Sequence, residues 1–273
     1  MSSRPPPPAH LFSAAGLAAL QRLCSGRPLL AFDFDGTLVP IAPRPDGVRL
    51  AAAVADDLRR LGLRWPVAVI SGRARGDLRP RLGFEPQYLV GCHGADDGSA
   101  AVAAWSQPLR EWHGGLAAQA AALDAAGIRV EDKGAALALH YRGAPDPARA
   151  LRLLQALQAT LPPALKGYGG KQVFNVVAAA APDKADALHA LLQRSGCDSA
   201  LFAGDDVNDE PVFQRAPPPW LTVRVGRAGA RTQARFALRN PAEVAQLLAR
   251  LAADGNPPRP GTPNDPRSSP VPP

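Results

Sequence analysis

Mainly apolar runs alternate with amphipathic stretches along most of this chain. Runs with the length of a buried strand occur at five places: 29–33, 66–70, 87–90, 200–203 and 221–225. Helical periodicity follows most of them, at 48–61, 75–81, 184–194, 209–214 and 241–252. A stretch at 11–20 predicts an opening helix rather than a signal peptide, because no small-residue cleavage site follows it. This alternation predicts a mainly parallel sheet with helices on both faces.

The alternation changes between residues 103 and 177. Two αββ units are predicted there, with helices at 108–126 and 146–160 and with strands at 128–132, 136–141, 164–168 and 172–176. Such a pair of units predicts a small α+β cap domain inserted into a doubly wound α/β core. The predicted boundaries are 10–102 and 178–253 for the core, 103–177 for the cap, and 1–9 and 254–273 for disordered tails rich in Pro, Ser, Gly and Asn.

Composition excludes several classes of protein. The chain has 273 residues, of which 46% are hydrophobic, so it can bury a substantial core. No apolar stretch approaches the roughly 18 residues of a membrane span, so no membrane partner is expected. The net charge of +7 comes mostly from scattered arginines, which argues against nucleic-acid binding but would attract a phosphorylated substrate. Three cysteines without paired spacing predict a reducing compartment, and we expect the cytoplasm.

The segment after the first apolar run carries two carboxylates, Asp33 and Asp35. Side chains two residues apart lie on the same side of an extended backbone, so both carboxylates converge at the end of the strand. Like charges at this spacing repel unless a cation or a shared proton lies between them. Mg²⁺ fits, since it prefers oxygen ligands and often takes one or two carboxylates. An acidic turn at Gly36 is the alternative interpretation.

Three further polar groups follow apolar runs or begin helices. Ser71, Gly72 and Arg73 form a turn whose hydroxyl and N–H groups could hold a phosphate. Lys184 lies in the first turn of a predicted helix capped by Asp183, where a cation opposes the helix dipole unless an anion is near. Carboxylates cluster after the fourth run, at Asp205, Asp206, Asp209 and Glu210.

Each group also has a purely structural interpretation, namely a common turn, an exposed lysine or the acidic first turn of a helix. An EF-hand is excluded for the acidic cluster, because its residues lack the spacing of the calcium loop. Ligands of open α/β sheets bind outside the carboxyl ends of the strands, and all the groups fall at such ends or at the adjoining helix. Together they supply the nucleophile, charge clamps and metal ligands that phosphoryl transfer needs.

In this order and context, the motifs resemble those of the haloacid-dehalogenase (HAD) superfamily of aspartate-nucleophile phosphatases. Its four motifs match Asp33-Phe34-Asp35-Gly36-Thr37, Ser71, Lys184 and Gly204-Asp205-Asp206. Within that superfamily the chain is most similar to the trehalose-6-phosphate phosphatase family, over about residues 25–252. The segments that carry this similarity lie at 35–40, 71–73, 91–94, 140–142 and 204–210. The resemblance implies a HAD-like Rossmannoid core with a cap.

The resemblance also implies the reaction and the roles of the motif residues. Asp33 would attack the phosphorus of trehalose 6-phosphate, and Asp35 would act as general acid and then as general base. Mg²⁺ would be held by Asp33, by the backbone carbonyl of Asp35 and by Asp205, with support from Asp206 and Asp209. Phosphate would be bound by Ser71, Gly72 and Lys184.

Substrate recognition is expected from the cap, which would close over the site. The candidates are Arg73, His93, Lys133, His140, Arg142, Lys171 and Asn175, with Glu131 as a weaker one. Taken singly, each is also compatible with a solvated strand position, and His93 with a hydrogen-bonded structural histidine. The family often has Glu where this chain has Asn175, and usually Thr where it has Asn208.

Two alternatives to a trehalose-6-phosphate phosphatase follow. Because Asn175 concerns sugar recognition, the first keeps the chemistry and changes the substrate to another sugar phosphate. The second is a phosphosugar-sensing regulatory module without catalysis. Such a module should have lost a nucleophile or a metal ligand, yet Asp33, Asp35, Lys184 and Asp205 are all present. A functional link to a trehalose-6-phosphate synthase is a further expectation.

Overall fold

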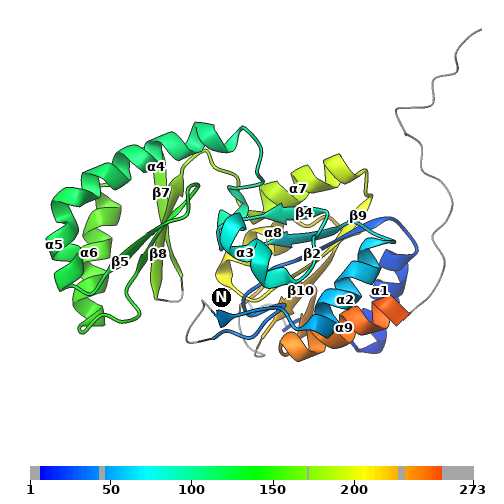
Figure 1. Ribbon diagram of the computed structural model, residues 1–273. Coiled ribbons are helices and arrows are strands. Elements are labelled where there is room, and N and C mark those ends of the chain that lie inside the picture. The colour runs from blue at the N-terminus through cyan, green and yellow to red at the C-terminus, as the bar shows by residue number, and fades with distance from the viewer. Residues whose placement is uncertain (1–6, 43–46, 171, 227–230, 254–273) are drawn as a thin grey trace, which may run out of the picture.

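The chain folds into two lobes that lie side by side (Figure 1). The computed structural model describes residues 7–42, 47–170, 172–226 and 231–253. The larger lobe contains both ends of this described part, and the smaller one, green in Figure 1, is formed by the middle of the chain. The predicted tails lie largely outside the described residues, at 1–6 and 254–273. Ala9, which was assigned to the first tail, lies instead in a short strand.

A seven-stranded sheet forms the centre of the larger lobe, in the order β1-β11-β10-β9-β2-β3-β4, and every neighbouring pair is parallel. Its strands are β1 (Ala9–His10), β2 (Pro28–Phe32), β3 (Val67–Ile70), β4 (Tyr88–Val90), β9 (Ser199–Gly204), β10 (Leu221–Val225) and β11 (Phe236–Leu238). The parallel α/β sheet predicted from the alternation of elements is confirmed. The short strands β1, at one edge of the sheet, and β11, beside it, were not predicted, because strands this short leave little pattern in the sequence.

Helices cover both faces of this sheet, because alternate side chains of its central strands point to opposite sides. Leu30 and Phe32 of β2 pack into a core shared with α1 (Ala14–Cys24), α2 (Ala52–Gly62), α3 (Arg75–Leu82) and α9 (Pro241–Ala253). Leu29 and Ala31 pack into a second core shared with α7 (Lys184–Ser195) and α8 (Glu210–Arg215). Burial on both faces explains why these strands are continuous apolar runs in the sequence.

The smaller lobe is a four-stranded antiparallel sheet with three α-helices against one face. The strands β5 (Arg129–Asp132), β6 (Leu137–His140), β8 (Val173–Ala178) and β7 (Leu165–Gly170) pair in that order. Leu139, Phe174 and Val176 pack toward α4 (Val102–Leu116), α5 (Ala120–Ala125) and α6 (Pro147–Ala159). Because side chains alternate along β8, Asn175 lies on the opposite face of the sheet from Phe174.

Several boundaries differ from the predicted ones. The helix predicted at 108–126 begins earlier, at Val102, and breaks into α4, the 3₁₀ turn η3 (Ala117–Gln119) and α5. Gly114 and Gly115 weaken the helix just before this break. Two more 3₁₀ turns, η2 (Cys92–Gly94) and η4 (Val207–Asp209), occur beside the polar motifs. The domain boundaries at 102/103 and 177/178 remain a prediction.

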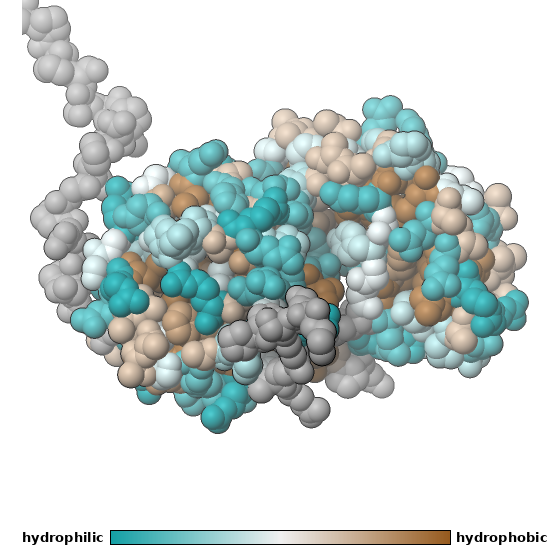
Figure 2. Space-filling view, turned by 180° about the vertical axis from the view of Figure 1, so that it is seen from behind, coloured by the Kyte–Doolittle hydropathy of each residue, from teal (hydrophilic) through white to brown (hydrophobic). Residues whose placement is uncertain are grey.

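The surface seen from behind carries polar and apolar side chains interspersed over both lobes, with a hollow between the lobes (Figure 2). Among the helices in the described part of the chain, none combines the length and the apolar character that crossing a bilayer requires.

Candidate active site

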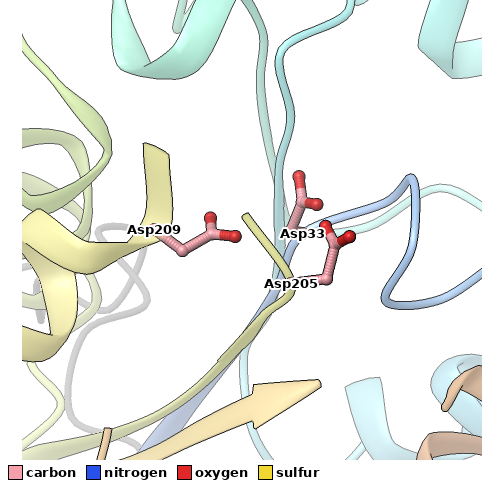
Figure 3. Close-up of side chains that lie close together, drawn as sticks. All are labelled: Asp33, Asp205 and Asp209. Carbon is pink, nitrogen blue, oxygen red and sulfur yellow. The ribbon is translucent and has the colours of Figure 1, made fainter. Parts of the chain in front are cut away.

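Asp33 and Asp205 lie side by side because their strands are neighbours in the sheet. β2 pairs with β9 in a register that places Phe32 opposite Ala203. Because the two strands are parallel, their carboxyl ends lie at the same end of the sheet, and an aspartate follows each of them. Asp209 approaches the pair from η4 (Figure 3). Carboxylate oxygens of the three residues lie within 4.8 Å of one another.

The three carboxylates are buried and crowded. Their residues retain 5%, 9% and 0% exposure for Asp33, Asp205 and Asp209 respectively. Gly36, whose φ is +83°, permits this arrangement, since a Cβ at that position would lie 2.1 Å from Asp205 Oδ2. Three hard oxygen ligands in one place match the preference of Mg²⁺. The donor set therefore fits a divalent cation. Asp209 joins this cluster itself, beyond the supporting position expected of it.

Lys184 provides the cation that balances part of this charge. Its Nζ donates to Asp33 Oδ1 at 2.8 Å and to Asp209 Oδ1 at 2.7 Å, and the residue is 2% exposed. Burial lowers the pKa of Lys184, but Asp209 and Asp33 raise it by more, so it lies above the ordinary lysine value. Burial raises the pKa of Asp33 well above its ordinary value, although Lys184 opposes the shift.

The first turn of α7 explains why Lys184 points inward. Asp183 is the N-cap, as predicted, and its carboxylate accepts hydrogen bonds from the backbone N–H groups of Ala185 and Asp186. The Asp186 carboxylate in turn accepts a hydrogen bond from the Asp183 backbone N–H, completing a capping box. Asp209 is oriented in a similar way, since its Oδ2 accepts the Asp206 N–H at 2.9 Å.

Ser71, Gly72 and Arg73 form a tight turn after β3. Ser71 is 1% exposed, and its Oγ accepts the Arg73 N–H at 3.2 Å. His93 packs against the turn from η2, and its backbone N–H donates to the Ser71 carbonyl at 2.9 Å. A Cβ on Gly72 would lie 2.3 Å from the His93 ring, so only glycine fits here.

His93 is held in an unusual conformation. Both it and Cys92 have positive φ, at 59° and 51°, which is uncommon outside glycine. Burial, together with the charges of Lys184 and Lys133, lowers the pKa of His93 well below its usual value, so the ring is neutral near pH 7. Its Nδ1 is buried and has no hydrogen-bond partner among the described residues. The ring meets Tyr168 of the cap edge-on, with centroids 5.6 Å apart.

Asp35 is not a member of the three-aspartate cluster, and its carboxylate binds Arg73 instead. It accepts two hydrogen bonds from the Arg73 guanidinium, from Nε at 2.6 Å and from Nη2 at 2.8 Å. Arg73, expected to bind substrate, therefore faces the catalytic candidate Asp35. The prediction that the Asp35 backbone carbonyl binds metal is not tested by this arrangement.

A cleft of about 810 Å³ joins these groups to the cap. Asp33, Ser71, Lys184 and Asp205 line it from the core, and the predicted substrate residues that line it are Arg73, His93, Lys133, His140, Arg142 and Asn175. Lys133 Nζ reaches the Gly72 carbonyl at 3.1 Å, and His140 Nε2 lies 2.7 Å from Glu131 Oε2. Asn175 is 3% exposed. Lys171 lies outside the described residues.

Comparison with known proteins identifies the family. The family model described as trehalose-phosphatase matches residues 31–219, more than half of the chain. The chain belongs to the trehalose-phosphatase family. It is 33% identical over 254 residues to a trehalose-phosphate phosphatase of Mycobacterium avium, with 84% of this chain and 63% of the relative covered. It is also 35% identical over 254 residues to an uncharacterized glycosyl hydrolase of Mycobacterium tuberculosis, covering 86% of this chain and 19% of that protein.

The chain thus spans less than two thirds of the length of these curated relatives. Among solved structures, the C-terminal domain of a Candida albicans trehalose-6-phosphate phosphatase aligns with a TM-score of 0.76. It is 24% identical and covers 92% of this chain and all of that one, so it shows that the trehalose-phosphatase fold is shared. The predicted HAD-like core with an α+β cap is confirmed, and the cap sheet is antiparallel.

Some residues of this trehalose-phosphatase cleft were not predicted from the sequence. Arg129, Asp77 and Ile41 all line it. Arg129 reaches the cleft because β5 pairs with β6 and places it opposite His140, which periodicity alone does not reveal. Asp77 could have been found, since it lies four residues after Arg73 at the start of a helix, the spacing of an ion pair. Ile41 follows an isolated bridge between Asp35 and Val39, and no pattern marks it.

Proposed function

We propose that the protein is a Mg²⁺-dependent phosphomonoester hydrolase that converts trehalose 6-phosphate to trehalose and phosphate in trehalose biosynthesis. Membership of the trehalose-phosphatase family supports this proposal. So does the name of the Mycobacterium avium relative, a trehalose-phosphate phosphatase. The observation that carries it is the cluster of Asp33, Asp205, Asp209 and Lys184, three of which line the cleft between core and cap.

The buried carboxylates are the groups that would hold the metal. Asp33 and Asp205 would bind it directly, with the Asp35 carbonyl, and Asp209 and Asp206 would orient the site or add a ligand. When bound, Mg²⁺ would neutralise charge on the phosphoryl group during transfer. Lys184 bridges Asp33 and Asp209, so it fixes their positions before substrate arrives.

The chemistry of the first step belongs to Asp33 and Asp35. A carboxylate oxygen of Asp33 attacks phosphorus, forming an aspartyl-phosphate as the bond from phosphorus to the sugar oxygen breaks. The carboxyl group of Asp35 gives its proton to the departing oxygen. In the second step Asp35 accepts a proton from the attacking water, which releases phosphate and restores the Asp33 carboxylate. The hydroxyl of Ser71, the turn at Gly72 and the Lys184 ammonium would bind the phosphate oxygens.

Sugar recognition is assigned to the cap side of the cleft. The proposed contacts are Lys133, His140, Arg142, Lys171 and Asn175, together with Arg73 and His93 from the core. A buried amide such as that of Asn175 can both donate to and accept from a sugar hydroxyl. A cytoplasmic location and a functional link to a trehalose-6-phosphate synthase remain predictions.

Replacement of the nucleophile tests the covalent mechanism. Asp33→Asn should lower Mg²⁺-dependent phosphate release from trehalose 6-phosphate by at least about 10³-fold, because the amide is a poor nucleophile. Asp56→Asn is the matched control: Asp56 is exposed on α2 and paired with Arg59, so phosphate release should be unchanged. Turnover by Asp33→Asn at a rate near that of the parent would show that no aspartyl-phosphate forms on this residue.

A panel of sugar phosphates separates the proposed substrate from its alternative. Asn175, where the family often has Glu, is the observation that favours another sugar phosphate. Phosphate release should be at least about tenfold more efficient with trehalose 6-phosphate than with glucose 6-phosphate. Equal efficiencies would support the alternative substrate. Binding of trehalose 6-phosphate without phosphate release from any compound would instead support the regulatory module.

A further inference from the structure

One arginine connects two carboxylates in the lining of the cleft. Arg73 binds Asp35 through Nε and Nη2, at 2.6 and 2.8 Å, and binds Asp77 through Nη1 at 2.9 Å. All three nitrogens of the guanidinium are therefore occupied by carboxylates. The Arg73 side chain is 11% exposed, whereas those of Asp35 and Asp77 are 33% and 39% exposed. The arginine is thus the buried member of this group.

Arg73 is itself fixed by its surroundings. Asp77 also binds Arg81, whose Nε lies 3.1 Å from Asp77 Oδ2 and whose Nη1 donates to the Val48 carbonyl at 3.2 Å. The Arg73 guanidinium lies over the Phe34 ring, 5.7 Å from its centroid. A planar fork held on three sides can fix a carboxylate in both position and orientation, which a lysine cannot.

The same residue belongs to the predicted phosphate loop. The backbone N–H of Arg73 donates to Ser71 Oγ at 3.2 Å, while its side chain holds the Asp35 carboxylate. Arg73 therefore connects the predicted phosphate-binding turn, through its backbone, to the proposed proton donor, through its side chain. Asp35 is one-third exposed, and the hydrogen bonds that restrain its carboxylate come from the Arg73 guanidinium.

We propose that Arg73 is a positioning residue for Asp35 rather than a sugar-binding residue. When Asp35 carries the proton on one oxygen, the guanidinium holds the other oxygen and so directs the proton toward the departing sugar oxygen. This inference rests on the proposed function, in which Asp35 is the general acid. Loss of Arg73 should therefore matter most where the leaving group must be protonated. An alkoxide leaves badly without a proton, whereas p-nitrophenolate leaves without help.

The test compares two leaving groups in a single turnover, so that only the first step is observed. Enzyme in excess is mixed with trehalose 6-phosphate or with p-nitrophenyl phosphate, with saturating Mg²⁺, and leaving-group release is followed. Arg73→Gln should slow release of trehalose by about 10- to 100-fold, within the range of general acid catalysis. Release of p-nitrophenol should change less than about threefold. Equal slowing of both would overturn the inference.

A double-mutant cycle distinguishes this inference from the proposed function. If Arg73 acts through Asp35, the double variant Arg73→Gln/Asp35→Asn should release trehalose as fast as Asp35→Asn alone. The inference would be overturned if the rate losses of the two single variants multiply in the double variant. If Asp35→Asn still slows trehalose release more than p-nitrophenol release, the proposed function remains intact. Asp35→Asn that slows both substrates equally would overturn the acid role of Asp35 and the inference with it.

Two further variants guard against a purely structural effect. Arg79→Gln removes an arginine of α3, the helix that contains Asp77; Arg79 pairs with Glu85 outside the cleft, so the kinetics of this variant should match those of the parent. Asp77→Asn removes the second anchor of Arg73 without touching Asp35, so it should give a smaller loss with the same dependence on leaving group. If Arg73→Gln does not fold, Asp77→Asn replaces it in the comparison of leaving groups. No dependence on leaving group in a folded Asp77→Asn would then contradict the role of Arg73.

Discussion

At the scale of single residues, Gly36 determines where a metal ligand can lie. The Asp205 carboxylate occupies the space in which a side chain at position 36 would begin, with Oδ2 2.1 Å from that Cβ position. The φ of +83° adds a second reason for glycine, since other residues are strained there. A short turn in the first motif is thereby coupled to a carboxylate 169 residues later in the chain.

The change Gly36→Ala should weaken Mg²⁺ binding by about 10- to 100-fold, as expected when a metal ligand is displaced. Calorimetric titration with Mg²⁺ in the absence of substrate measures this. Gly47→Ala is the matched control, because a Cβ there meets no atom of the described residues within 4 Å, and it should bind Mg²⁺ like the parent. Equal affinities of the two variants would mean that Asp205 is not a ligand.

Lys184 combines structural and functional effects in one side chain. Because it separates the buried Asp33 and Asp209, Lys184→Met leaves two carboxylates without their cation. The free energy of unfolding should fall by about 3–5 kcal/mol, measured by urea denaturation without metal. Adding Asp209→Asn to Lys184→Met removes one stranded charge and should recover part of this loss. A double variant that is less stable than the single one would rule out charge imbalance as the cause.

At the scale of elements, the short strand β1 is attached to the last helix by one carboxylate. His10 Nε2 lies 2.8 Å from Glu243 Oε2, which also accepts the Arg239 N–H at 2.8 Å. Burial raises the pKa of Glu243, but these two hydrogen bonds and the charges of the same partners lower it by more. A lowered pKa means that the carboxylate stabilises the fold above the ordinary pKa of glutamate. That stability is lost as pH falls through the lowered value.

Glu243→Gln should therefore lower the melting temperature at pH 7 by about 2–4 °C. The difference from the parent should shrink as pH falls toward about 3, because protonation removes the same charge from the parent. Thermal melts across pH measure both effects. Glu85→Gln, at an exposed ion pair with Arg79, is the control and should shift the melt by less. A gap that stays constant down to pH 3 would contradict the role of the Glu243 charge.

At the scale of the whole molecule, the cap touches the phosphate-binding turn directly. Lys133, just after β5, donates to the Gly72 carbonyl, and Tyr168 of β7 meets His93 beside the same turn. Because the cleft lies between the lobes, these contacts connect cap position with the site where phosphate is expected. Closure of such a cap would exclude water from the reacting groups.

Lys133→Met should disturb this connection while leaving the catalytic carboxylates in place. The KM for trehalose 6-phosphate should rise by about 10-fold or more, as for loss of a hydrogen bond to a charged group. Hydrolysis of p-nitrophenyl phosphate, which lacks the sugar, should change little. Lys166→Met, which removes a lysine bound to the Ala179 and Ala181 carbonyls, is the control. An unchanged KM in Lys133→Met would show that the cap contact does not contribute to substrate binding.

Sequence patterns located most elements and the groups at their ends. Strands β2, β3 and β9 were predicted within one residue at each end, because buried parallel strands leave apolar runs. Asp183 was predicted as a helix cap, since capping depends on neighbours within four residues. The short strands β1 and β11 and the break after Leu116 were missed, because such short features leave little periodicity.

The sequence by itself determined the order of the elements and the placing of Asp33, Lys184 and Asp205 at their ends, since periodicity and turn chemistry act over a few residues. Only the tertiary structure decided which charges pair. Arg73 meets Asp35 across 38 residues, and Lys184 meets Asp33 across 151. Pairing at such separations depends on strand order, on register and on the space that packing leaves, and none of these can be read from a local pattern.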